Sequence, residues 1–137
     1  GPEQTLAETE RPPGRITWSP DGRSLALALA DATGEPAVVS VPAAGGRVRP
    51  LVARATAPLW LADGRLVFVR ETRSGTFDLW SVRVNDAAAV PGSERRLTDL
   101  GAGRTADRVR GASTDGRHLF FRILSAASED VWLAEAP

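Results

Sequence analysis

"ITWSPDGRSLALA", which spans residues 16–28, places a tight Ser-Pro-Asp-Gly turn between two runs that are typical of strands. Asp can accept hydrogen bonds from the backbone that follows it, and Gly tolerates a positive φ, so Asp-Gly closes a hairpin at low steric cost. The pattern returns in "PLWLADGRLVFVR", residues 58–70, and in "GASTDGRHLFFRI", residues 111–123. The turn therefore belongs to a repeat.

The spacing of the repeat indicates an architecture. Asp21, Asp63 and Asp115 are separated by 42 and 52 residues, and periods near 40 to 50 residues are typical of propeller blades. A third strand follows each hairpin, as "PAVVSV", "FDLWSV" and "EDVWLA", and short fourth runs begin at Thr5, Pro50 and Arg96. No long segment has a sustained helical period. We predict an all-β chain of three propeller blades, each with four antiparallel strands.

These motifs resemble the TolB-type β-propeller repeat of bacterial periplasmic and signalling proteins. The first turn matches its Trp-Ser-Pro-Asp-Gly hallmark in full, and the third copy has Ala112 where Trp is usual. The resemblance covers nearly the whole chain after about residue 5. It rests on Trp18 to Gly22, Trp60 with Asp63-Gly64, Asp78-Leu79-Trp80, Leu97-Thr98, Asp115-Gly116 and Asp130-Val131-Trp132.

The resemblance implies a non-catalytic module that binds a protein or peptide, as a sensor or scaffold part of a larger bacterial protein. It also implies a periplasmic or extracytoplasmic location, which the residues alone leave open. Two other functions stay open: the gating propeller of a prolyl-oligopeptidase-like hydrolase, and a binder of a small ligand in the propeller channel.

Length and composition are those of one globular domain. The chain has 137 residues, of which 42% are hydrophobic, and its 17 basic residues balance 17 acidic ones. We assign residues 1–4 to a tag remnant and leader, and residues 5–137 to the propeller domain. Zero net charge disfavours nucleic acid as a partner. No apolar run approaches the roughly 20 residues that span a bilayer, and the absence of cysteine excludes disulfides.

Nothing in the sequence supports catalysis, a metal or a cofactor. His118 is the single histidine, and no Gly-x-Ser-x-Gly elbow, phosphate loop or zinc pattern accompanies it. We therefore expect a half-exposed strand residue. Asp21, Asp63 and Asp115 are interpreted as turn residues rather than metal ligands. Asp78 and Asp130 recur at one repeat position, which predicts a structural bond to loop backbone.

The four tryptophans also recur at repeat positions. Large rings bury much apolar area, so we predict that Trp18, Trp60, Trp80 and Trp132 pack between neighbouring blades rather than bind a ligand.

Basic residues gather at one place only, in "GRTADRVRGAS" around Arg104. Arg108 and Arg110 are two residues apart on the expected innermost strand of the third unit, so both side chains would project from one strand face toward the channel mouth. A solvated loop is the simpler interpretation, and we prefer it. The channel mouth remains the place to look for contacts with an acidic ligand.

Three blades are fewer than the four to eight that close a ring. Unpaired edges are usually avoided in soluble proteins, so we expect two copies, related by a two-fold axis, to close a six-bladed ring. In this homodimer the segment around Thr5 to Glu8 would pair with the strand around Asp130 to Ala134 of the other chain.

Overall fold

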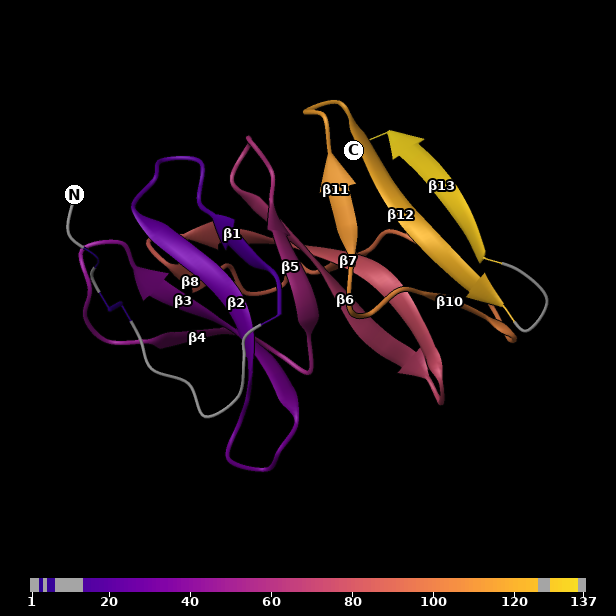
Figure 1. Cartoon of the computed structure of the whole chain (residues 1–137), viewed down its shortest axis with the longest axis horizontal. Coiled ribbons are helices and arrows are strands. Elements are labelled where there is room, and N and C mark those ends of the chain that lie inside the picture. Colours follow the sequence, from indigo (N-terminus) through magenta and orange to yellow (C-terminus); the bar gives the residue numbers. More distant parts are fainter. Residues whose placement is uncertain (1–2, 4, 7–13, 126–128, 136–137) are drawn as a thin grey trace.

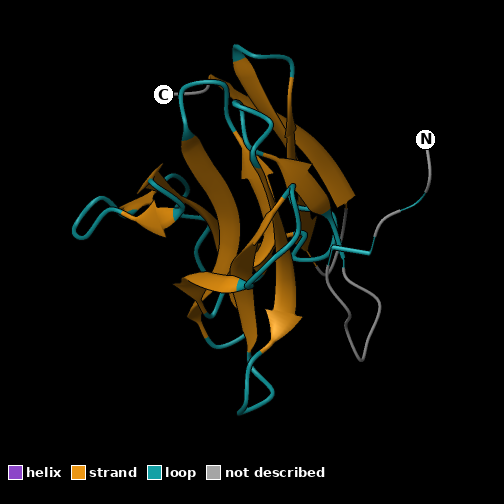
Figure 2. Cartoon of the chain, turned by 90° about the vertical axis from the view of Figure 1, so that its left-hand side faces the viewer, coloured by secondary structure: helices purple, strands orange, loops and turns teal. Residues whose placement is uncertain are grey.

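The computed structural model describes residues 3, 5–6, 14–125 and 129–135, and within these ranges it contains strands and no helix. Three antiparallel sheets lie side by side in chain order (Figure 1). In the view turned by 90°, short loops join the strands at the ends of the sheets (Figure 2). The predicted all-β class is confirmed.

Each sheet is built from one repeat. Sheet 1 has the order β1 (Ile16–Trp18), β2 (Ser24–Ala30), β3 (Pro36–Pro42) and β4 (Arg49–Ala53). Sheet 2 has the order β5 (Thr56–Trp60), β6 (Arg65–Arg73), β7 (Thr76–Asn85) and β8 (Ala88–Ala89), and β9 (Arg95–Arg96) also pairs with β7. In sheet 3, β10 (Arg104–Ala106), β11 (Ala112–Thr114) and β13 (Glu129–Glu135) all pair with β12 (His118–Ser125).

The three Asp-Gly turns close hairpins as predicted. Gly22, Gly64 and Gly116 have φ values of 70°, 90° and 97°. In each turn the Asp carboxylate accepts the amide hydrogen of the residue two positions later, over 2.9 to 3.1 Å. The structural interpretation of Asp21, Asp63 and Asp115 is confirmed.

Sheet 3 differs from the other two sheets at its outer edge. In the described residues, β13 has no further strand at its outer edge, where β4 lies in sheet 1 and β8 and β9 lie in sheet 2. The predicted fourth run at Pro50 is β4, and the run at Arg96 shortens to the two residues of β9. Ala7 and Glu8, half of the segment from Thr5 to Glu8 that is proposed to fill the remaining edge in a second copy, lie outside the described residues.

The core consists of two apolar layers, one in each gap between sheets. Because successive side chains of a strand point to opposite faces, Leu66 and Phe68 of β6 pack toward sheet 1, whereas Val67 and Val69 pack toward sheet 3. All four are essentially inaccessible to solvent. Sheet 2 is therefore buried on both faces and holds the other two sheets in place.

The packing role predicted for the tryptophans is confirmed for two of them. Trp60 and Trp80 pack against the layer between sheets 1 and 2. Trp18 and Trp132 are 56% and 46% exposed, so within the single chain these two do not pack between sheets. Trp18 lies on a sheet with no described sheet before it. Trp132 lacks the outer strand that Trp80 has in β9.

Candidate functional site

The inner edge of the molecule is formed by β1, β5 and the pair β10 and β11. Each of these strands pairs with a neighbour on one side only, and the strands follow one another across the molecule (Figure 1). The innermost strands, which form this edge, are the ones predicted from the sequence to line a channel. Part of this inner edge is buried within the chain, at Ala57, Ala106 and Ala112, so only its exposed stretches can meet a partner.

A turn interrupts the inner strand of sheet 3. Ala106 pairs with Ile123 and Ala112 pairs with Phe121, so residues 107–111 bulge out opposite Arg122 alone. Arg108 and Arg110 lie in this turn, as the preferred interpretation of a solvated loop expects, and the alternative that placed both on one strand face is wrong. Asp107 and Gly111 are the residue types that mark turns, and they could have revealed the interruption from the sequence.

Asp107 shapes the turn. Its Oδ1 accepts the amide hydrogens of Val109 and Arg110, both over 3.0 Å, and its backbone oxygen accepts the amide hydrogen of Gly111 over 2.8 Å. Its Oδ2 lies 3.5 Å from a guanidinium nitrogen of Arg122. The carboxylate is buried on the inner side of the turn. The residues at the tip of the turn, 108–110, are exposed to solvent.

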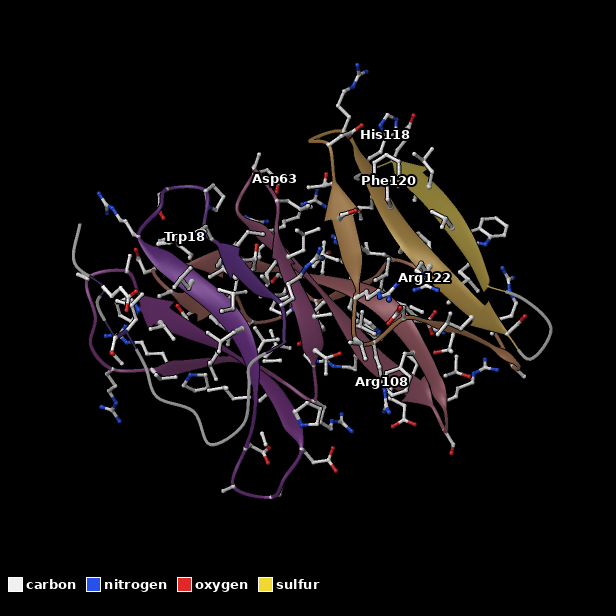
Figure 3. The ribbon with its side chains drawn as sticks, viewed as in Figure 1. Trp18, Asp63, Arg108, His118, Phe120 and Arg122 are labelled. Atoms are coloured by element: carbon white, nitrogen blue, oxygen red, sulfur yellow. The ribbon has the colours of Figure 1, made fainter. Side chains whose placement is uncertain are left out.

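The two arginines at the tip of the turn lie in different environments. The guanidinium of Arg108 lies over the ring of Phe77, 5.2 Å from the centroid, and Figure 3 shows Arg108 beside the lower end of sheet 2. Arg110 is exposed, and its guanidinium has no hydrogen bond or ion pair with the described residues. Val109 between them is 73% exposed. The tip therefore offers one apolar side chain and one available cation.

The turn is docked against the inner strand of sheet 2. The hydroxyl of Thr56 donates a hydrogen bond to the backbone oxygen of Arg108 over 3.0 Å. Gly111 has φ +62°, and a Cβ there would lie 2.6 Å from the Cβ of Ala57. Ala57 itself has φ +50°, within a register shift of β5. Two backbone irregularities on neighbouring sheets thus fit together and hold the turn.

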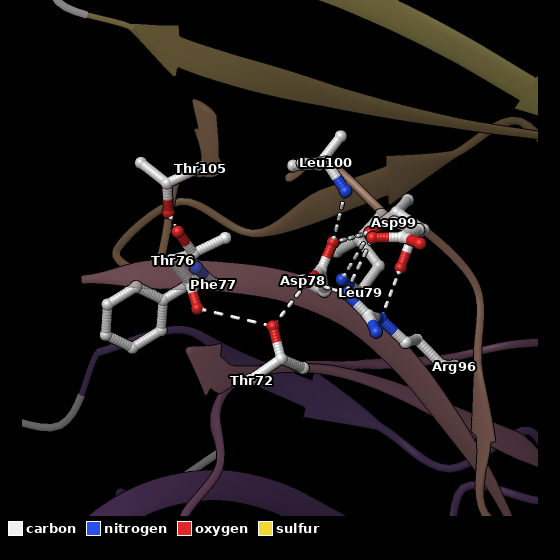
Figure 4. Close-up of polar contacts among 10 residues, drawn as sticks. Thr72, Thr76, Phe77, Asp78, Leu79, Arg96, Asp99, Leu100 and Thr105 are labelled. Atoms are coloured by element: carbon white, nitrogen blue, oxygen red, sulfur yellow. Dashed lines mark hydrogen bonds and ion pairs between the residues drawn. The ribbon is translucent and has the colours of Figure 1, made fainter. Parts of the chain in front are cut away.

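A buried carboxylate anchors the segment that leads from sheet 2 to sheet 3 (Figure 4). Asp78 accepts hydrogen bonds from the hydroxyls of Thr72 and Thr98, from the amide of Leu100 and from Arg96, over 2.6 to 3.1 Å. Burial raises the pKa of Asp78, but these donors lower it more, so the pKa lies below its ordinary value. The predicted bond to loop backbone is confirmed for Asp78, whereas the side chain of Asp130 lies outside the described residues.

His118 has the half-exposed position predicted for it. It is the first residue of β12, and its Nδ1 lies 3.0 Å from Oδ2 of Asp115. The amide of Arg117, followed by the His118 ring, lowers the pKa of Asp115 to about 2. No hydroxyl is hydrogen-bonded to the His118 ring within the described part of the chain. The pair closes the third turn much as Arg65 and Asp63 close the second.

A cavity of about 620 Å³ lies between sheets 1 and 2, where the first two Asp-Gly turns converge. Its wall includes Trp60, Asp86 and Ala87, and the last two have φ values of 50° and 59°. The indole nitrogen of Trp60 is buried without a hydrogen-bond partner among the described residues. The volume suits a small molecule, and the cavity reaches the inner edge at Trp60, the last residue of β5. Sequence reasoning missed it because its walls come from separate repeats.

Two further classes of site were searched for. The described ranges hold no group of three acidic or histidine side chains placed to bind a metal ion. They also hold no helix long and apolar enough to cross a membrane.

Solved structures share this architecture. A protein described as TolB from Agrobacterium tumefaciens aligns with 93% of this chain at a TM-score of 0.71 and 21% identity, and TolB from Acinetobacter baumannii aligns with 88% at a TM-score of 0.58 and 15% identity. The chain spans 47% and 31% of those two proteins. No protein-family model and no curated protein sequence matches it. The predicted likeness to TolB-type β-propellers is thus confirmed at the level of the fold.

Proposed function

We propose that the chain is a non-catalytic β-propeller module of a larger bacterial protein and that it binds a protein or peptide partner at its inner edge. The observation that carries the proposal is the turn at residues 107–111. Asp107 and Ala57 hold it in place, and it presents Val109 and Arg110 to solvent.

The chemistry of the tip favours an acidic, extended segment of a partner. A carboxylate of the partner would pair with Arg110, with Arg108 close by in the chain, and an apolar side chain would contact Val109. Arginine suits this role because its planar guanidinium can bind a carboxylate through two hydrogen bonds. The preformed turn reduces the conformational entropy that binding would otherwise cost.

The architecture of the module is part of the proposal. Each sheet serves as one blade, and a second copy supplies the remaining three blades of a six-bladed ring. The alignment with 47% of the Agrobacterium protein supports this, because two copies have about the length of that chain. In such a ring the inner edges of both copies surround one channel, and the two turns at residues 107–111 face that channel together.

A defined pair of peptides tests the binding site. Fluorescence anisotropy would be measured with a labelled Ala-Glu repeat peptide and with an Ala-Lys repeat peptide of equal length. We expect binding of the acidic peptide only, weakened about tenfold by Arg110→Glu. Arg83→Glu, which changes an exposed arginine of β7, is the matched control and is expected to bind like the unaltered protein. Equal affinity for both peptides, or equal losses in both variants, would contradict the proposed site.

A further inference from the structure

Sheet 3 exposes a position that the other two sheets bury. Val38 of β3 and Leu79 of β7 occupy the same repeat position, directed toward the next sheet, and they are 0% and 1% exposed. The equivalent residue of β13 is Val131, which is 76% exposed. The difference does not lie in the residue type, because all three are aliphatic. It lies in the absence of a following sheet among the described residues.

The adjacent repeat position gives the same comparison. Ser40 and Ser81 are buried on this face of sheets 1 and 2, whereas the equivalent Leu133 is 56% exposed. Leu133 pairs with the half-buried Phe120 of β12. We call Phe120, Val131 and Leu133 the following face of sheet 3. A leucine replaces a serine at this position, so the following face is more apolar than its counterparts.

At the other end of the molecule, sheet 1 exposes the opposite kind of face. Trp18 lies across from Leu25 in the ladder of β1 and β2, as Trp60 lies across from Leu66 in sheet 2. Trp60 packs against sheet 1, whereas Trp18 and its neighbour Ile16 are exposed. We call Ile16 and Trp18 the preceding face of sheet 1. The side chains of β2 and β3 on this side of sheet 1 are buried or half-buried within the single chain, so among these three strands the side chains of β1 are the ones exposed to solvent.

The contact between sheets 1 and 2 shows how these two kinds of face meet. The amide of Trp60 donates a hydrogen bond to the hydroxyl of Thr17 over 3.1 Å. The amides of Ser19 and Leu61 each point into their own hairpins. Since donors alternate along an antiparallel ladder, the amides of Trp18 and Trp60 both point away from their own sheets. Trp18 is therefore set up to make the same bond to a preceding sheet.

The following face carries a matching acceptor. Thr17 pairs with Ala26 in sheet 1. In sheet 3 the residue five positions after the turn aspartate, as Ala26 is after Asp21, is Phe120, and its ladder partner is Ser113. Ser113 is exposed and, like Thr17, has a hydroxyl group. Sheet 3 therefore offers both an apolar surface, which includes Phe120, and a hydrogen-bond acceptor, the hydroxyl of Ser113. These are the two features that β1 with Trp18 needs in a preceding sheet.

We propose that Trp18 of one copy docks on the following face of sheet 3 in a second copy, with its amide donating to the Ser113 hydroxyl. Trp18 lies on sheet 1 and Phe120 on sheet 3, with sheet 2 between them (Figure 3), so the two do not meet within the described residues of one chain. A two-fold axis makes the contact twice and uses both free faces. This inference rests on the proposed ring and assigns the residues that close it. Removing the exposed indole and aliphatic groups from water drives the association.

Charged substitutions test the contact by sedimentation equilibrium of the intact chain. We expect the unaltered protein to be a dimer at micromolar concentration. Leu133→Asp or Trp18→Lys alone should weaken the dimer about tenfold or more, because each buries an unpaired charge. An equimolar mixture of the two variants should recover association, since one of its two contacts then joins Asp to Lys and the other is unaltered. Val109→Asp is the matched control: Val109 is an exposed apolar residue that lies on neither face, so the dimer of this variant should be unchanged.

Cysteine cross-linking locates the contact, and the cysteine-free chain gives no background. Trp18→Cys and Ser113→Cys in one chain should form an intermolecular disulfide, whereas Trp18→Cys with Val109→Cys should not. A dimer that neither charged substitution weakens and that does not form the first cross-link would refute this contact while leaving the ring intact. A monomer at all concentrations would refute both the contact and the ring, but not the peptide site at residues 107–111.

Discussion

The hydroxyl of Thr98 donates a hydrogen bond to Oδ1 of Asp78 over 2.7 Å. This bond ties the segment after β9 to the middle of β7, and the amide of Leu100 reaches the same oxygen over 3.1 Å. Asp78 is fully buried, so its carboxylate accepts hydrogen bonds that several donors would otherwise make to water. Asp78 is therefore a main anchor of the chain between sheets 2 and 3, beside the pairing of β9 with β7 and the bond from the amide of Leu97 to the backbone oxygen of Leu79.

We expect Asp78→Ala to lower the free energy of unfolding by about 2 to 4 kcal/mol, because it leaves the partly buried donors of Thr72, Thr98 and Leu100 without an acceptor. Urea denaturation would measure the loss. Asp63→Ala, which removes an exposed carboxylate bonded to Arg65, is the control and should cost less than about 1 kcal/mol. Equal losses in the two variants would contradict the anchoring role of Asp78.

Stability should fall in acid. The pKa values of Asp78 and Asp115 are lowered in the folded chain, the latter to about 2, so the unfolded chain binds more protons at low pH. The stability that these carboxylates contribute is present above their unfolded pKa, about 3.9, and is lost as the pH falls through the folded values. Urea midpoints at several pH values would show the decline, and Asp78→Asn should make it shallower. A variant with an unchanged slope would contradict the assignment to Asp78.

The hairpin turns require glycine for its conformation and not for space. Gly22 and Gly64 have positive φ, and a Cβ at either would meet no atom within 4 Å. Gly22→Val and Gly64→Val should each destabilise the fold by about 1 kcal/mol or more. Gly14→Val is the matched control, because Gly14 has equal space and no positive φ. Thermal melting compares the three variants, and unchanged melting temperatures in the first two would refute the strain.

Gly111 combines strain with crowding, so we expect Gly111→Ala to destabilise more than a turn glycine does, by about 2 kcal/mol or more. Its methyl group would press on Ala57. Ala57→Gly opens the space, and the double variant should therefore lose less stability than the sum of the two single changes. A double-mutant cycle by urea denaturation measures this coupling. Strict additivity would show that the two residues do not hold the turn through their contact.

The purified chain should not turn over a p-nitrophenyl ester, a p-nitrophenyl phosphate or a peptide amide. His118 is paired with Asp115, and no hydroxyl of the described residues is bonded to its ring, so an activated nucleophile is missing. Spectrophotometric assays would check this. Turnover that disappears in His118→Ala would contradict the non-catalytic proposal.

Local chemistry made part of this fold predictable. An Asp-Gly pair closes its own hairpin, whatever surrounds it, because the carboxylate and the flexible backbone act within a few residues. Asp21, Asp63 and Asp115 could thus be assigned to turns from the sequence, and the recurrence of Asp78 indicated a structural carboxylate. The alternation of apolar residues in β6 likewise follows from the geometry of a single strand.

The sequence by itself determined the repeat, the strands and the turns that join them, because those depend on neighbours in the chain. Only the tertiary structure decided what each repeat position meets. Trp18 and Trp60 share one motif, yet Trp60 packs against a preceding sheet and Trp18 is 56% exposed. The sequence left Arg108 and Arg110 either on one strand face or, as we preferred, in a solvated loop, and the buried carboxylate of Asp107 holds them in a turn. Burial and docking depend on residues that are distant in the chain, so only the assembled sheets could decide them.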